Sequence, residues 1–180
     1  GQMLVSRRAR AAVSLALKTA KDEGIRVAFN MHDLNFRAVA VQEVIETIRS
    51  QADILIGNER EIRGCFEIDA NAVDLDAFMG VLAERGQILA MTRGAKGACL
   101  FSHEGVSTVP SENHQSVVDS TGAGDAFAGA FLYGLAQGFS LPAAGKLAAL
   151  SAAEIIRVWG GRPEKPLAVV LKSYLDSVRP

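Results

Sequence analysis

Hydrophobic positions along the chain alternate between helical and strand patterns. Apolar runs next to turn signals predict strands at residues 25–30, 53–56, 88–92, 98–102 and 106–109. Helical spacing predicts helices at 5–21, 42–50, from 58 onward, and at 74–85, 124–137, 142–158 and 167–178. This alternation predicts an α/β fold, an open and mainly parallel sheet with helices on both faces.

A glycine-rich loop precedes one of these helices, in the segment 119–131, Asp-Ser-Thr-Gly-Ala-Gly-Asp-Ala-Phe-Ala-Gly-Ala-Phe. The backbone amides of Gly122, Ala123 and Gly124 can converge on one point at the positive end of the helix dipole, which predicts an anion site. Asp125 beside it can accept a proton from an attacking hydroxyl group. A side-chain N-cap followed by a first-turn acid is the structural alternative.

Two further motifs follow predicted strands. Asn58 and Glu61 come directly after a buried strand, at the sheet edge where ligands of doubly wound folds bind. The same spacing also fits a capping box with a purely structural role. Thr92, Gly94 and Gly97 belong to a turn between two strands, where glycine allows a nucleotide to approach the backbone closely.

The segment 119–131 resembles the C-terminal signature of the PfkB (ribokinase-like) carbohydrate kinases, Asp-Thr-Thr-Gly-Ala-Gly-Asp-x-Phe, and departs from it at Ser120. The family's Asn-x-x-Glu and Thr-x-Gly-x-x-Gly motifs match the two motifs above. The resemblance implies a ribokinase-like fold in which Asp125 is the catalytic base and residues 122–124 form the anion hole. It also implies that Asn58 and Glu61 organise Mg²⁺, and that the Thr-x-Gly-x-x-Gly turn lies along ATP.

Other positions carry weaker family resemblances. Many members bind a monovalent cation, and the corresponding positions, which imply a K⁺ site, are Asp119, Thr121, Ile155, Val158 and Gly160. Gly160 also fits an ordinary helix C-cap. Residues 33–37, Asp-Leu-Asn-Phe-Arg, resemble the Asp-x-Asn-x-Arg of family sugar kinases, or form an Asx-rich loop. An adenine pocket is expected around residues 144–150, whose small apolar side chains predict recognition by shape.

Composition limits the class of protein. The chain has 180 residues, 49% of them hydrophobic, and a net charge of −1, which favours one globular domain and argues against nucleic acid or an anionic membrane as partner. No apolar run approaches the roughly 20 residues of a membrane-spanning helix. Cys65 and Cys99 show no metal-ligand spacing and are expected to be buried, reduced thiols of a cytoplasmic protein.

The resemblance identifies residues 1–180 as the C-terminal ATP-binding and catalytic portion of a PfkB-type kinase, without the N-terminal part, the di-glycine sugar motif and the lid. It implies transfer of the γ-phosphoryl group of ATP to a sugar hydroxyl. A nucleoside kinase of the same superfamily and a nucleotide-binding module without turnover are the alternatives. The isolated chain is expected to bind nucleotide weakly, to phosphorylate sugars poorly, and to form homo-oligomers or self-associate through an exposed sheet edge.

Overall fold

The computed structural model describes residues 7–31, 46, 50–66, 68, 74–112 and 117–178. It divides into two compact units, of which unit 1 comprises residues 1–91 and 101–105, and unit 2 comprises residues 92–100 and 106–180. The motif predicted at residues 33–37 lies outside the described residues, as does most of the helix predicted at 42–50.

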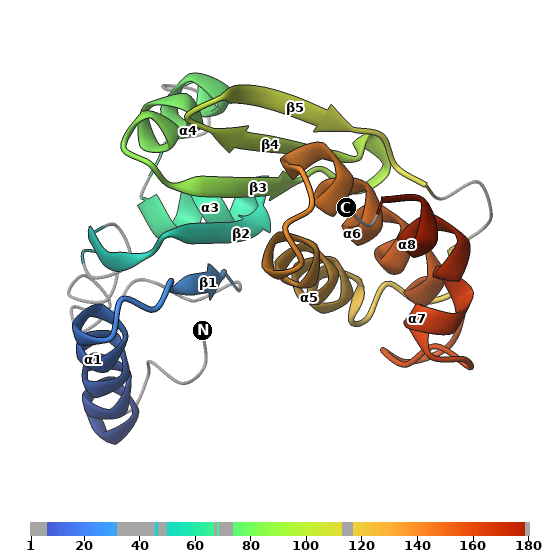
Figure 1. Ribbon diagram of the computed structural model, residues 1–180, viewed down its shortest axis with the longest axis horizontal. Helices are drawn as coiled ribbons and strands as arrows, with labels where there is room; N and C mark the ends of the chain where they lie inside the picture. Colours follow the sequence, from blue (N-terminus) through green and yellow to red (C-terminus); the bar gives the residue numbers. More distant parts are fainter. Residues whose placement is uncertain are drawn as a thin grey trace. The chain divides into compact units, whose positions relative to one another are not determined.

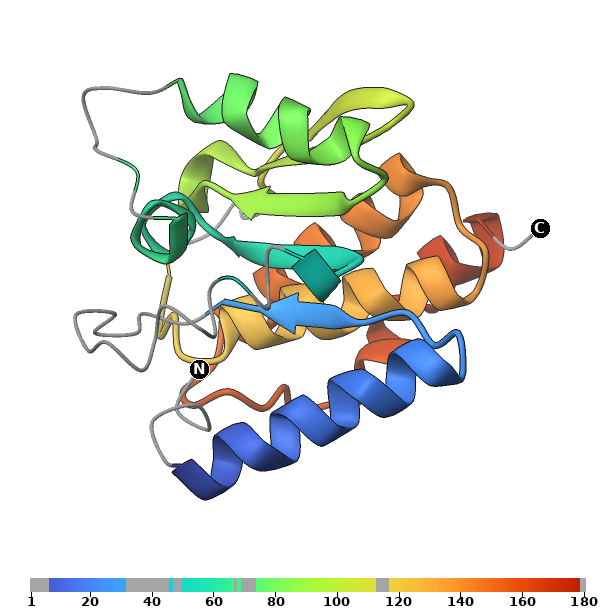
Figure 2. The same cartoon turned by 90° about the vertical axis from the view of Figure 1, so that its left-hand side faces the viewer.

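Unit 1 is built around parallel strands and the helices that follow them (Figure 1). Its elements are α1 (Arg7–Asp22), β1 (Ala28–Asn30), β2 (Ile54–Asn58), α3 (Glu59–Phe66), α4 (Leu75–Glu84) and nearly all of β3 (Ile88–Thr92). β1 and β2 run side by side in parallel, with Ala28 opposite Ile54 and Asn30 opposite Ile56 (Figure 2). β2 is buried over residues 54–57, as its apolar run predicts.

The strands form one open sheet in the order β1-β2-β3-β4-β5, which is completed by β4 (Ala98–Ser102) and β5 (Gly105–Val109). β2 and β3 are connected through α3 and α4, the long crossover that parallel strands require. Short turns connect β3, β4 and β5, so these strands form antiparallel hairpins. The predicted α/β class and open sheet are therefore confirmed, with an antiparallel edge after β3.

Unit 2 ends in helices that pack closely because glycines line their contacts. Its helices are α5 (Ala123–Ala136), α6 (Leu141–Ile155), α7 (Leu167–Val170) and α8 (Lys172–Val178). A methyl group on Gly134 of α5 would lie 2.8 Å from the Cβ atom of Ala144 on α6. A methyl group on Gly145 would lie 2.4 Å from Leu100 Cδ1 of β4 and 2.8 Å from Val109 Cγ2 of β5. Hence α6 packs directly on α5 and on the β4–β5 hairpin.

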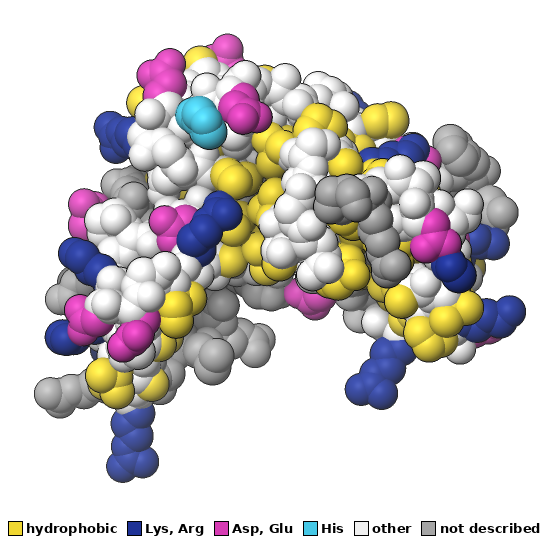
Figure 3. All heavy atoms as spheres, in the orientation of Figure 1, with side chains coloured by type: hydrophobic (Ala, Val, Ile, Leu, Met, Phe, Trp, Pro, Cys, Tyr) yellow, Lys and Arg dark blue, Asp and Glu magenta, His cyan; other side chains and the backbone are white. Residues whose placement is uncertain are grey.

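The prediction of a single helix at residues 167–178 is wrong, because the chain leaves helical geometry at Leu171 (φ −96°, ψ 13°). Leu171 and Leu175, four residues apart on one helix face, are both buried, while Val169 stays 62% exposed. Some large hydrophobic side chains of other helices, such as Val81 of α4 and Tyr133 of α5, are also exposed. Figure 3 shows hydrophobic side chains at the surface between charged ones.

Two expectations from composition can be compared with this structure. Cys65 and Cys99 are free and buried, as predicted. None of the helices in the described ranges combines the length and the apolarity that crossing a membrane requires.

Candidate active site

A cavity of about 320 Å³ lies within unit 2. Its walls come from the turn after β3, the loop after β5, the start of α5 and the second half of α6. Five residues predicted to bind nucleotide or phosphate line it, namely Thr92, Gly94, Gly97, Ala123 and Gly124. The structure therefore brings two of the predicted motifs to one cavity.

The loop before α5 requires glycine at position 122. Gly122 is the N-cap residue of α5 and adopts the left-handed conformation (φ 79°, ψ −2°). A methyl group there would lie 2.8 Å from the Cα atom of Gly161. Among the described residues no side chain caps this helix, so the expected alternative of a side-chain N-cap is wrong. The Ala123 amide donates to the Ser120 carbonyl at 3.2 Å and closes a turn.

Asp125 lies in the first turn of α5, where its side chain is exposed to solvent. Ala123 and Gly124, which come just before it, line the cavity. The α5 N-terminus carries the partial positive charge of the helix dipole, so an anion and an ionised carboxylate are both favoured here. This arrangement can present a proton acceptor beside a bound phosphate group.

The glycine turn after β3 is closed by the Arg93 amide, which donates to the Gly97 carbonyl at 2.7 Å. Gly97 has φ 84°, and a methyl group on it would lie 2.1 Å from the carbonyl oxygen of Val109. The turn therefore packs against the end of β5 and brings Ser111 and Glu112 into the cavity wall beside it.

The turn also carries two cations, Arg93 and Lys96, whose side chains are of the type that contacts phosphate groups. The Arg93 guanidinium instead donates to the Cys99 sulfur at 2.9 Å. Neither Arg93 nor Lys96 is among the described residues that line the cavity.

Asn58 and Glu61 form a capping box at the start of α3 in unit 1. The Asn58 amide donates to Glu61 Oε2 at 2.8 Å, and the Glu61 amide donates to Asn58 Oδ1 at 2.9 Å. Asn58 and Glu61 thus have the geometry of the capping box, which was the structural alternative to a role with Mg²⁺. The described residues contain no cluster of three or more potential metal ligands. Because Mg²⁺ commonly uses one or two carboxylates together with water and substrate phosphates, the remaining carboxylate oxygen of Glu61 fits a supporting role.

The residues predicted for a monovalent cation lie together in unit 2. Asp119 Oδ1 accepts the Thr121 amide and Oδ2 accepts the Gly160 amide, both at 2.9 Å. These hydrogen bonds, those from Thr121 first, lower the pKa of Asp119 and favour its ionised form. The Val158 amide donates to the Ile155 carbonyl at 3.3 Å in the turn that follows α6. Asp119 thereby joins the loop before α5 to the loop after α6.

The apolar wall of the cavity lies further along α6 than residues 144–150. It is formed by Ala149, Ala152, Ala153 and Ile156, so only its first residue falls in the predicted range. Sequence reasoning also missed Glu112, a lone acid in a loop with no periodic or motif signal.

Comparisons with known proteins identify the family. The model of the pfkB family carbohydrate kinases matches residues 3–166. A probable fructokinase-5 of Arabidopsis thaliana is 33% identical over 144 residues, a match that covers 77% of this chain and 43% of the fructokinase.

Two crystal structures resemble the chain in fold. Adenosine kinase from Sinorhizobium meliloti superposes with a TM-score of 0.81 at 29% identity, covering 96% of this chain and 52% of that one. Aminoimidazole riboside kinase from Salmonella enterica, complexed with aminoimidazole riboside and an ATP analogue, gives a TM-score of 0.77 at 25% identity, covering 96% and 60%.

The chain thus belongs to the pfkB family of carbohydrate kinases and has a ribokinase-like fold. It spans about half the length of the curated relatives that it matches.

Proposed function

We propose that this chain supplies the ATP-binding and phosphoryl-transfer part of a kinase that phosphorylates a sugar hydroxyl. The observation that carries the proposal is the cavity of unit 2. The start of α5 with its glycine loop forms one part of the wall, and the turn at residues 92–97 forms another. A helix N-terminus on one cavity suits the phosphates of a nucleotide, and a glycine turn along the same cavity allows its ribose and phosphates to approach closely.

The proposed transfer assigns separate tasks to residues of one loop and helix start. Asp125 accepts the proton of the acceptor hydroxyl while its oxygen bonds to the γ-phosphorus and the bond to the β-phosphate oxygen breaks, releasing ADP. The Gly122 and Gly124 amides stabilise negative charge on the transferred group. Positioning and electrostatics supply most of the rate in such reactions.

Two cations belong to the proposal. Mg²⁺ would neutralise negative charge on the phosphates of ATP, and the Glu61 carboxylate with Asn58 is the pair that the family resemblance implies to organise it through water. A K⁺ ion would be held by the ionised Asp119 with oxygens of Thr121 and of the loop after α6, including the carbonyls of Ile155, Val158 and Gly160. In this role Asp119 would also fix the loop that carries the anion hole.

The proposal is tested at Asp125, in a chimera that joins the N-terminal part of the Arabidopsis relative to this chain. The Asp125→Asn substitution should lower kcat with ATP and fructose by about 100-fold or more and leave ATP affinity nearly unchanged, because a general base acts in the transition state. Asp76→Asn is the matched control, since Asp76 is a first-turn acid of α4 outside the cavity. Turnover of the Asp125→Asn chimera at the rate of the unsubstituted chimera would refute the assignment.

A nucleoside acceptor is the second candidate, favoured by the likeness to adenosine kinase at 29% identity. Thermal-shift titrations of the chain with Mg·ATP, followed by sugars or nucleosides, distinguish the candidates. A sugar that raises Tm beyond the nucleotide alone supports a sugar kinase, and a nucleoside that does so supports the alternative. If the chimera binds nucleotide and phosphorylates neither kind of acceptor, the chain behaves as a nucleotide-binding module.

A further inference from the structure

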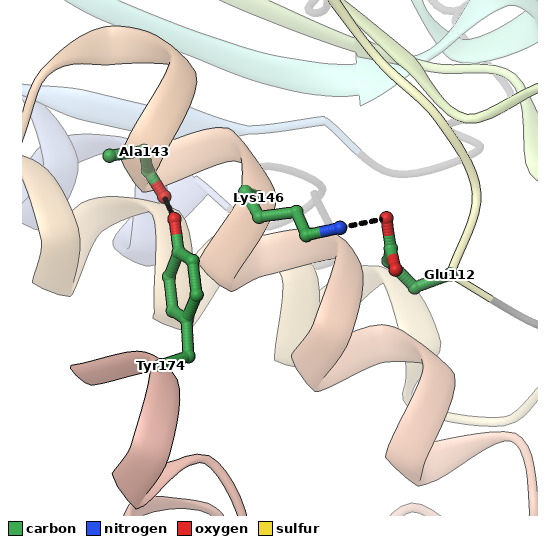
Figure 4. Close-up of polar contacts among 4 residues, drawn as sticks. All are labelled: Glu112, Ala143, Lys146 and Tyr174. Carbon is green, nitrogen blue, oxygen red and sulfur yellow. Dashed lines mark hydrogen bonds and ion pairs between the residues drawn. The ribbon is translucent and has the colours of Figure 1, made fainter. Parts of the chain in front are cut away.

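Glu112 is the one charged residue among the described residues that line the cavity of unit 2. Its side chain is 13% exposed, and its Oε1 atom lies 2.5 Å from Nζ of Lys146 on α6 (Figure 4). A carboxylate in such a wall is costly without a cation, and it repels phosphate groups. The position of the ion pair along the cavity therefore decides what it can contact.

Helix α6 gives that position. Its C-terminal end lies beside the anion loop, because the Ile156 carbonyl accepts the amide of Val118, the residue before Asp119. Lys146 comes ten residues before Ile156, which corresponds to about 15 Å along a helix that rises 1.5 Å per residue. The ion pair thus marks the cavity end remote from the phosphate-binding loop, where the base of a bound nucleotide would lie.

The ion pair is anchored on both sides. On α6, Gly145 packs on Leu100 and Val109, and the Tyr174 hydroxyl of α8 donates to the Ala143 carbonyl at 2.8 Å, one turn before Lys146 (Figure 4). On the other side, Glu112 follows the segment against which Gly97 packs. The carboxylate is therefore positioned before any ligand arrives.

An ionised carboxylate accepts hydrogen bonds and cannot donate them. Since Oε1 of Glu112 accepts from Lys146, Oε2 is the atom available to an N–H group of a ligand. The 6-amino group of adenine is such a donor, whereas guanine carries an acceptor oxygen at the same position. We propose that Glu112, held by Lys146, determines base specificity by accepting a hydrogen bond from the adenine amino group. This inference rests on the proposed function and adds hydrogen bonding to the expected recognition by shape.

Isothermal titration of the 180-residue chain with three nucleotides tests the inference. Mg·ATP should bind about tenfold more tightly than the Mg complex of purine riboside triphosphate, which differs only by lacking the amino group, because a hydrogen bond to a charged acceptor is lost. Mg·GTP should also bind more weakly than Mg·ATP. In Glu112→Ala the preference for ATP over the purine analogue should fall to within about twofold.

Glu154→Ala is the matched control. It removes an α6 carboxylate that forms an ion pair with Arg157 at 3.0 Å, and Glu154 does not line this cavity. It should keep the tenfold preference. If Glu112→Ala does not fold, as judged by circular dichroism, Glu112→Gln replaces it, and its preference should shrink because the acceptor loses its charge.

The outcomes separate this inference from the proposed function. Equal binding of ATP and the purine analogue by the unsubstituted chain, a preference for GTP, or an unchanged preference in the Glu112 variants would overturn the inference while ATP binding stands. Failure of every nucleotide to bind would overturn the proposed function and this inference with it.

Discussion

Replacing Gly97 with alanine should destabilise the protein far more than the same change at Gly94 in the same turn. Both residues have positive φ. An alanine at Gly94 (φ 56°) incurs about 1–2 kcal/mol of left-handed strain, and one at Gly97 (φ 84°, ψ −137°) incurs about 1–3 kcal/mol, because that region is nearly restricted to glycine. A Cβ atom at Gly94 would meet nothing within 4 Å, whereas one at Gly97 would lie 2.1 Å from the Val109 carbonyl oxygen. That oxygen is backbone and cannot rotate away.

The expected magnitudes follow from these contacts. Displacing the backbone around Gly97 adds about 1–3 kcal/mol to the destabilisation of that variant. In both variants alanine also reduces the conformational freedom of the unfolded chain, which offsets about 0.4–1 kcal/mol of the loss. Gly97→Ala should therefore lose about 2–4 kcal/mol of unfolding free energy and Gly94→Ala about 0.5–1 kcal/mol. Because Gly97 packs beside the Ser111–Glu112 wall, its alanine variant should also bind ATP more weakly.

Urea denaturation followed by circular dichroism measures both losses, and the midpoint shift at constant m-value gives the difference. Gly94→Asn serves as an additional control, since asparagine tolerates the left-handed region. Two alanine variants of equal stability, within about 0.5 kcal/mol, would refute the reasoning that the turn packs tightly against β5.

Three further predictions concern ions and pH. Potassium should raise ATP affinity relative to a bulky organic cation at matched ionic strength, and indifference to potassium would leave Gly160 as a plain helix cap. Hydrogen bonds lower the folded-state pKa of Asp119. The ionised carboxylate therefore stabilises the fold above the unfolded pKa near 4, and this contribution disappears as pH falls through the folded pKa. Asp119→Asn should therefore flatten the acid limb of a stability–pH profile, and an unchanged limb would contradict this. Tyr174→Phe should cost about 1 kcal/mol by removing the hydrogen bond to Ala143. Burial raises the pKa of Tyr174, so native stability should fall above about pH 10, and the phenylalanine variant should lack that decline.

Elements with strong local signals were predictable from the sequence. The strands at 88–92 and 98–102 have the predicted bounds, since apolar runs bounded by turn residues define them. The helix that follows the glycine loop begins at Ala123, one residue before the prediction, because Gly122 can take the left-handed N-cap geometry. Capping likewise set the start of α4, where the Asp74 carboxylate accepts the Asp76 amide at 3.0 Å.

Features that depend on long-range packing were not predictable. The break at Leu171 has no signal in the sequence, because residues 167–178 contain neither glycine nor proline, the residues that usually mark the end of a helix. The placement of Glu112 depends on Gly97 packing against Val109 and on Lys146, which lies 34 residues away in sequence. The Asn58–Glu61 pattern was visible, yet sequence alone left its capping and metal roles open.

The central claim, that the glycine loop before α5 binds the phosphates of ATP, is tested most directly by nuclear magnetic resonance of the ¹⁵N-labelled chain. Titration with Mg·ATP should move the Gly122 and Gly124 amide proton resonances downfield, because amides that donate to phosphate oxygens are deshielded, and adenosine should move them far less. Gly80 and Gly129, whose surroundings are open within 4 Å and which do not line the cavity, serve as controls and should stay in place. Loop amides that do not respond to Mg·ATP, or that respond equally to adenosine, would contradict the account.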